Sequence, residues 1–185
     1  MEANEKPKAA NGSVDLKILG EMQTNRGEDL AALSQKQPIM LFFLRHFGCT
    51  FCREALDEIS KKRKSIEDSG IKIVFVHMAD EPTAKKYFTK FKMPDATFVG
   101  DSECKYYAHF GLVKGSATQL FGLQSFVRGF QSGILKGYGL GRPIGDGFQM
   151  PGIFIIFRNE IRESYVHKLA SDVPDYMKLA KCCEL

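Results

Sequence analysis

Two cysteines, Cys49 and Cys52, lie where an apolar run gives way to an amphipathic segment. The run 38–44 begins with proline and is apolar throughout, which is typical of a strand buried on both faces. Apolar residues then recur at three- and four-residue spacings from 52 to 66, which predicts a helix. The β-branched run 71–76 predicts a second strand, and a strand–helix–strand unit of this size has parallel strands. The sequence therefore predicts an α/β fold with the cysteine pair at a strand-to-helix junction.

The rest of the chain contains further strand and helix patterns. They are a helix at 83–91, a short strand at 97–99, a short helix at 106–112, a β-hairpin of strands 152–157 and 161–167, and a last helix over 172–182. The hairpin adds antiparallel pairing to the parallel unit. We therefore expect a mixed central sheet flanked by helices on both faces.

Two segments differ in composition from the rest. Residues 113–148 hold nine glycines without a sustained period, yet they include several Phe and Leu residues. We expect a partly packed, Gly-rich insertion before the C-terminal hairpin, close to functional surface. Residues 1–13 are polar and are expected to form a flexible leader. The remaining 14–185 fit a single domain, because domains usually hold about 50 to 250 residues.

Charge and hydropathy argue against several classes of partner. A net charge of +4, from 26 basic and 22 acidic residues, is too small and too dispersed to indicate nucleic-acid binding. The densest basic run, 61–64, is interpreted as a solvated helix face. The apolar run 39–44 is far shorter than the roughly 20 residues that cross a bilayer, and the first residues lack the apolar stretch of a secretion signal. We expect a soluble, cytoplasmic protein with no nucleic-acid or membrane partner.

The two-residue spacing of Cys49 and Cys52 suits a small disulfide ring that opens and closes reversibly. A helix N-terminus offers unpaired N–H groups and a partial positive charge, which favour thiolate over thiol. In the thioredoxin arrangement Cys49 is the nucleophile, and Cys52, one turn inward, resolves the mixed disulfide. Thr50 and Phe51 between the cysteines, and His46 just before them, are candidate modulators. His46 could add positive charge or shuttle a proton, or be an ordinary strand-end residue.

Two other interpretations of the pair involve no redox chemistry. The same spacing occurs in zinc sites, but these need two more ligands at suitable spacing, which Cys104, the adjacent Cys182 and Cys183 and the scattered histidines do not supply. We therefore expect no metal. A buried structural pair is the second alternative, since free cysteine packs as a small hydrophobe. The odd total of five cysteines also argues against a disulfide framework.

Met150 and Pro151 stand directly before the apolar strand that is predicted from residue 152. In thioredoxin-like folds a proline at this place is cis and faces the cysteine pair. Here it would leave the backbone of Met150 free to pair with an incoming substrate chain. We therefore take both residues as candidate substrate-binding residues. The alternative is a trans proline that merely starts a strand, since cis prolines are rare.

The stretches 42–54 and 145–154, together with the Gly-rich insertion, are similar to the peroxiredoxin-like branch of the thioredoxin superfamily, the AhpC/TSA-related group. The resemblance extends over about residues 14 to 180 and implies a thioredoxin-like fold. It also implies thiol-dependent reduction of peroxides or protein disulfides without a metal or organic cofactor. A thiol electron donor is then required, and a homodimer is a candidate assembly.

The sequence departs from that group at two positions of the site. Peroxiredoxins carry Thr or Ser three residues before the peroxidatic cysteine, so in that alignment Cys52 is peroxidatic and Cys49 replaces the hydroxyl residue. They also use an arginine at the start of the late strand to activate peroxide, and Pro151 occupies that position. Four arginines are candidates to replace it in space: Arg45, Arg53, Arg128 and Arg142.

Three functions fit these residues. The first is a thiol–disulfide oxidoreductase, a peroxiredoxin-like antioxidant protein that cycles Cys49 and Cys52 between dithiol and disulfide. The second is a thiol peroxidase with Cys52 as the peroxidatic cysteine. The third is a non-catalytic redox sensor or interaction module on the same fold. The other cysteines, Cys104, Cys182 and Cys183, are candidate resolving thiols.

Overall fold

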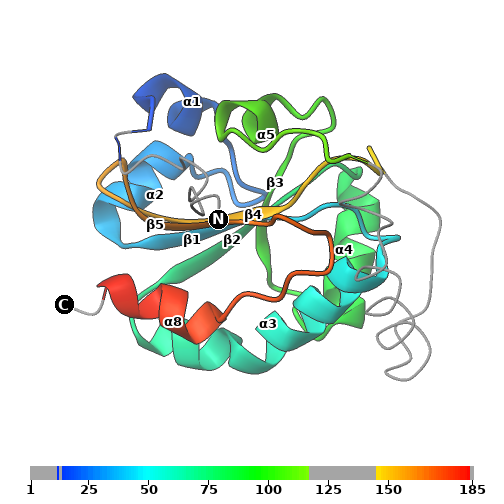
Figure 1. Ribbon diagram of the computed structural model, residues 1–185. Coiled ribbons are helices and arrows are strands. Elements are labelled where there is room, and N and C mark those ends of the chain that lie inside the picture. The colour runs from blue at the N-terminus through cyan, green and yellow to red at the C-terminus, as the bar shows by residue number, and fades with distance from the viewer. Residues whose placement is uncertain (1–11, 13, 117–144, 184–185) are drawn as a thin grey trace, which may run out of the picture.

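Five strands form a mixed sheet at the centre of the computed structural model, which describes residues 12, 14–116 and 145–183 (Figure 1). They are β1 (Ile39–Phe43), β2 (Lys72–His77), β3 (Thr97–Gly100), β4 (Gly152–Phe157) and β5 (Glu160–Val166), and their order in the sheet is β3-β2-β1-β4-β5. The first three strands are parallel, whereas β4 runs antiparallel to β1, and β5 antiparallel to β4. The predicted combination of a parallel unit with a hairpin is confirmed.

Helices cover both faces of this sheet (Figure 1). One face carries α3 (Thr50–Asp68), α4 (Glu81–Lys90) and α8 (Tyr176–Ala180), which is followed by the short 3-10 helix η2 (Lys181–Cys183). The other face carries α1 (Leu16–Glu21), α2 (Leu30–Lys36) and α5 (Lys105–His109). The side chains of β1 alternate between the two cores, and all five of them are buried, as predicted for a central strand.

The chain passes from β1 into α3 through residues 44–49. The Leu44 N–H donates to the carbonyl of Val76 at 2.9 Å, which continues the pairing of the two parallel strands. Cys49 is the N-cap of α3 with an extended backbone, and its carbonyl accepts from the Arg53 N–H at 3.1 Å, which closes the first helical turn. The predicted strand-to-helix junction is therefore confirmed, with Cys49 at the helix start.

Sequence patterns do not predict the two short helices before β1. Each begins after an aspartate, Asp15 for α1 and Asp29 for α2, whose carboxylate accepts a backbone N–H of the first turn. The last helix begins at Tyr176 rather than near residue 172. Pro174 disfavours helical backbone in the residue before it, and Asp175 supplies the cap by accepting from the Lys178 N–H at 3.1 Å.

Two predicted segments lie largely outside the described residues. The leader 1–13 is described only at residue 12, and the insertion 113–148 only at 113–116 and 145–148. The two described ends of the insertion meet, because the Gly115 N–H donates to the Phe148 carbonyl at 2.7 Å. The leader, the insertion and the single-domain division stay predictions. Within the described ranges, no helix combines the length and the apolar character that are needed to cross a membrane.

Candidate active site

The two cysteines lie one helical turn apart at the start of α3, and both are free thiols in this structure. Cys49 is 5% exposed and Cys52 is 6% exposed. Cys52 points back toward the end of β1, where the His46 N–H donates to its Sγ at 3.5 Å. The two sulphurs interact directly, with the Cys52 thiol hydrogen-bonded to Cys49. The structure therefore brings together the pair that the sequence singles out.

The environment of Cys49 favours its thiolate. Its pKa is lowered from the ordinary 9.0 to about 6, chiefly by the hydrogen bond from the Cys52 thiol. The positive charge of Arg45, whose Nη1 lies 3.2 Å from the Cys49 Sγ, lowers the pKa further, as do the backbone N–H groups of Phe51 and Cys52. These effects outweigh burial, which acts in the opposite direction. Cys49 therefore carries negative charge at neutral pH.

The environment of Cys52, in contrast, favours its protonated thiol. Burial raises its pKa well above the ordinary 9.0, and the charge of the neighbouring Cys49 raises it further. A protonated Cys52 is also the form that donates a hydrogen bond to the Cys49 sulphur. The pair therefore divides into a thiolate at the helix start and a thiol one turn inward.

Arg45 connects Cys49 to a segment about one hundred residues away in the chain. Its side chain is buried, and its Nε donates to the carbonyl of Gly147 at 3.0 Å, as does its Nη2. The same guanidinium therefore contacts both the Cys49 sulphur and the segment that leads into β4. Among the four candidate arginines, Arg45 is the one that contacts a cysteine sulphur within the described residues.

The other three arginines have different places. Arg53 donates through Nε to the carbonyl of Phe47 at 2.9 Å, and its guanidinium lies over the ring of Tyr87, 5.7 Å from the ring centre. Its position therefore supports the packing of α3 on α4. Arg128 and Arg142 lie outside the described residues.

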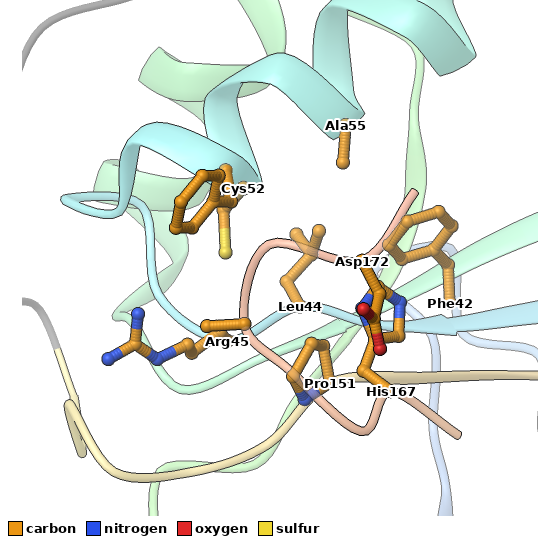
Figure 2. Close-up of a pocket in the computed structure, with 10 residues that line it drawn as sticks. Phe42, Leu44, Arg45, Cys52, Ala55, Pro151, His167 and Asp172 are labelled. Atoms are coloured by element: carbon orange, nitrogen blue, oxygen red, sulfur yellow. The ribbon is translucent and has the colours of Figure 1, made fainter. Parts of the chain in front are cut away.

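A small pocket reaches the cysteine pair from the side of Cys52 (Figure 2). Its walls are mainly apolar and are formed by Phe42, Leu44, Phe51, Ala55, Pro151 and Ala170. Its polar lining residues are Arg45, Cys52, His167 and Asp172. Figure 2 shows the Cys52 sulphur directed into the space between Leu44, Arg45 and Pro151. About 20 Å³ is open to a water-sized molecule, which is enough for one such molecule or the reacting end of a larger one.

The expectations for Met150 and Pro151 need correction. Pro151 does line the pocket with Cys52, but no cis peptide bond is present in the described residues, so the Met150–Pro151 peptide is trans. The backbone of Met150 is also not free: its N–H donates to the Val113 carbonyl at 3.3 Å, and its carbonyl accepts from the Gln149 side chain at 3.3 Å. A substrate chain cannot pair with this backbone unless those bonds break.

The three candidate modulators contribute in different ways. His46 cannot supply positive charge at neutral pH, because burial and the nearby Arg45 and Arg53 lower its pKa to about 4. Its contribution to the pair is its backbone N–H. Phe51 forms part of the pocket wall, and Thr50 is buried in the first turn of α3.

Cys104 and Cys182 lie away from the cysteine pair, and the side chain of Cys183 lies outside the described part of the chain. Cys104 is half-buried beside Met78, with 3.3 Å between the two sulphurs. Cys182 is exposed on η2, which Figure 1 places toward the C-terminal end of α3, opposite the cysteine pair. Nor do three or more His, Cys, Asp and Glu side chains gather into a metal-binding group anywhere in those ranges.

Sequence reasoning did not single out His167 and Asp172. They follow β5, more than a hundred residues after the cysteine pair, and no local motif marks them. The pattern of a hairpin followed by a helix could have indicated only that the connecting loop returns to this end of the sheet.

Comparison with known proteins places the chain in a family. The profile of the AhpC/TSA family matches residues 18–164. A prostamide/prostaglandin F synthase of Danio rerio is 40% identical over 81 residues, which make up 41% of this chain and 39% of that protein. The thioredoxin-like protein AAED1, chloroplastic, of Arabidopsis thaliana is 21% identical over 168 residues, 85% of this chain and 67% of that one.

Solved structures show the same fold. The crystal structure of peroxidoxin BcpB from Mycobacterium tuberculosis aligns with a TM-score of 0.60 at 14% identity, over 87% of this chain and 88% of that one. The match to the fish protein spans about two fifths of that protein's length, whereas the family profile covers most of the present chain. The chain therefore belongs to the AhpC/TSA family and is a peroxiredoxin-like member of the thioredoxin superfamily.

Proposed function

We propose that this protein is a thiol-dependent oxidoreductase in which Cys49 attacks the substrate and Cys52 resolves the product. The observation that supports this most strongly is the contact between the guanidinium of Arg45 and the Cys49 sulphur at 3.2 Å. A thiolate, not a thiol, is the reactive form of cysteine. A nucleophile with a pKa of about 6 is ionised at neutral pH, while its neighbour keeps its proton until it is needed.

With a peroxide, the Cys49 thiolate would attack the terminal oxygen of R–O–O–H. The S–O bond forms as the O–O bond breaks, and the alkoxide takes a proton to leave as an alcohol, which leaves Cys49 as a sulfenic acid. The Cys52 sulphur then attacks Cys49, forms the disulfide and releases the oxygen as water. A thiol electron donor reduces the disulfide and completes the cycle.

With a disulfide substrate, Cys49 would form a mixed disulfide and release the first thiolate. Cys52 would then displace the second thiolate and close the Cys49–Cys52 bond. The occupied backbone of Met150 argues against a polypeptide that binds by strand pairing, so we favour a peroxide as the substrate. The apolar walls of the pocket further favour a peroxide with an apolar substituent.

A second candidate is a peroxidase in which Cys52 is oxidised first. The observation that favours it is that Cys52, rather than Cys49, lines the pocket. Its raised pKa argues against it, because Cys52 would first have to lose its proton. The two mechanisms differ in the sulphur that first carries oxygen.

Substrate identity and location are narrower proposals. The Danio rerio relative is named prostamide/prostaglandin F synthase, and we propose a prostaglandin-type substrate as one apolar candidate to be assayed beside simple hydroperoxides. A cytoplasmic location stays a prediction, since the name of the Arabidopsis relative assigns that protein to the chloroplast. A homodimer likewise remains a prediction.

The test is a pulse of one equivalent of peroxide, followed by trapping of sulfenic acid and mass spectrometry of each cysteine. Sulfenic acid at Cys49 in Cys52→Ser, a Cys49–Cys52 disulfide in the native protein, and loss of turnover in Cys49→Ser would support the proposal. First oxidation of Cys52 would favour the second candidate. Stoichiometric oxidation without turnover, for any thiol donor, would refute both and leave a sensor.

A further inference from the structure

His167 follows directly on β5 and lines the pocket opposite Cys52 (Figure 2). The side chain is nine-tenths buried. Neither of its ring nitrogens makes a well-formed hydrogen bond within the described part of the chain. Buried polar groups in proteins are nearly always paired, so an imidazole whose contact with the Leu169 backbone falls short of a well-formed hydrogen bond lacks a full partner beside the pocket. A bound molecule in the pocket can supply that partner.

The imidazole of His167 is uncharged at neutral pH. Burial lowers its pKa to about 4, against weaker opposing effects of the Asp172 carboxylate and the Leu169 backbone. The groups that face it are Asp172, the ring of Tyr165 at 5.1 Å between ring centres, and across the pocket Cys52 and Arg45. Asp172 is itself engaged, because its Oδ2 accepts backbone N–H groups that begin the loop after His167. A neutral imidazole offers one donor and one acceptor.

We propose that His167 is a substrate-binding residue, which hydrogen-bonds the neutral hydroperoxide group of a compound whose apolar part lies against Phe42, Phe51 and Ala170. This inference rests on the proposed function. A hydroperoxide can donate to the acceptor nitrogen of a neutral imidazole or accept from its N–H, so it can pair with whichever ring nitrogen faces the pocket. His167 would hold the substrate in the same way whichever cysteine sulphur is oxidised first. It is thus a determinant of peroxide affinity rather than of cysteine reactivity.

His77 provides a matched contrast. It is also buried, its ring nitrogens also make no well-formed hydrogen bond within the described residues, and burial lowers its pKa to about 4 as well. Its neighbours, however, are the rings of Phe47, Phe88 and Phe98, and it does not line the pocket. Replacement of His77 therefore reproduces the loss of a buried imidazole without touching the proposed binding site.

The kinetic test compares tert-butyl hydroperoxide with hydrogen peroxide in three variants. His167→Phe is expected to raise KM about tenfold for both peroxides, the equivalent of one lost hydrogen bond, because both carry the O–O–H group that the imidazole binds. His167→Gln retains a donor and an acceptor and should recover most of the affinity. His77→Phe should leave both KM values unchanged. Equal KM values for His167→Phe and the native protein would overturn the proposal.

A binding experiment separates this inference from the proposed function. Reduced native protein is titrated with tert-butanol, the unreactive product alcohol, and the ring nitrogens of His167 are followed by NMR. A saturable change in the chemical shifts of these nitrogens supports the binding role even if no peroxide is turned over. In His167→Phe, where the Ala170 amide signal reports on binding instead, tert-butanol should bind about tenfold more weakly. Absence of saturable binding, or equal binding by the variant, overturns it. The native-protein measurement stands even if the variant fails to fold.

Discussion

The contact between Arg45 and Cys49 leads to a quantitative prediction for Arg45→Met. Methionine keeps much of the length and apolar stem of the arginine but removes the charge that lies 3.2 Å from the sulphur. The Cys49 thiolate then loses a direct electrostatic partner, while the hydrogen bond from the Cys52 thiol and the helix N-terminus remain. The pKa of Cys49 should therefore rise without returning to that of an unperturbed thiol.

The expected size of the change follows from the fall in the pKa of Cys49 from 9.0 to about 6. That difference corresponds to about 4 kcal/mol in favour of the thiolate, shared among several groups. An opposite charge in contact usually lowers a pKa by about one to three units, so loss of Arg45 should raise the pKa of Cys49 to about 7 or higher. For a pKa of about 7, the thiolate fraction at pH 6 falls from about one half to about one tenth, roughly fivefold, whereas at pH 8 it falls by only about a tenth.

The assay is a pH titration of thiolate ultraviolet absorbance, together with the pH profile of the reaction with peroxide. Arg53→Lys is the matched control, because Arg53 is also buried near the helix start but contacts Phe47 and Tyr87. The pKa of Cys49 in Arg45→Lys should lie between its values in Arg45→Met and in the native protein, because lysine keeps the positive charge but lacks the planar guanidinium. An unchanged pKa of Cys49 in folded Arg45→Met would refute the assigned role of the guanidinium.

Three further predictions concern other contacts. Cys52→Ala removes the largest contribution to the lowered pKa of Cys49, so the thiolate titration should move to higher pH by more than in Arg45→Met. The depressed pKa of His77, about 4 against 6.5 for an ordinary histidine, contributes stability that is present above pH 6.5 and lost as the pH falls toward 4. Between pH 7 and pH 5, the free energy of unfolding measured with urea should therefore fall by about 2 kcal/mol less for His77→Phe than for the native protein, and an equal fall would contradict this. Gly145→Ala places a Cβ 2.6 Å from a methionine side chain at a φ of +93°, so it should destabilise the protein by about 1–3 kcal/mol in thermal unfolding. Gly100→Ala, with open space around its Cβ, is the control and should cost far less.

Local patterns in the sequence are sufficient for the sheet and for the place of the cysteine pair. The apolar run of β1 and the periodicity of α3 are each determined by near neighbours, so these patterns alone put Cys49 and Cys52 at the start of a helix that follows a buried strand. Arg45 is different, because four arginines were equal candidates and only the three-dimensional course of the chain brings one of them to the sulphur.

The parts of the site that depend on distant segments were not predictable in the same way. His167 reaches the pocket because the β5 strand returns along the sheet beside β4, and nothing around it in sequence indicates a site. The expectation of a cis proline at residue 151 came from family resemblance, and it fails where the backbone of Met150 pairs with Val113 instead. Short capped helices such as α1 carry too few residues for a periodic signal.

The bonds of Arg45 to both Cys49 and Gly147 also bear on the direction of electron flow. A disulfide carries no negative charge, so oxidation of the pair takes away the anion that this buried guanidinium contacts directly. In a thermodynamic cycle, whatever stabilises the reduced thiolate relative to the disulfide makes the disulfide a stronger electron acceptor. In the proposed cycle, the residue that lowers the pKa of Cys49 would therefore also ease the reduction of the disulfide by a thiol donor. Because the same guanidinium also donates to the Gly147 carbonyl, we expect oxidation of the cysteine pair to change the contacts of the segment that leads into β4.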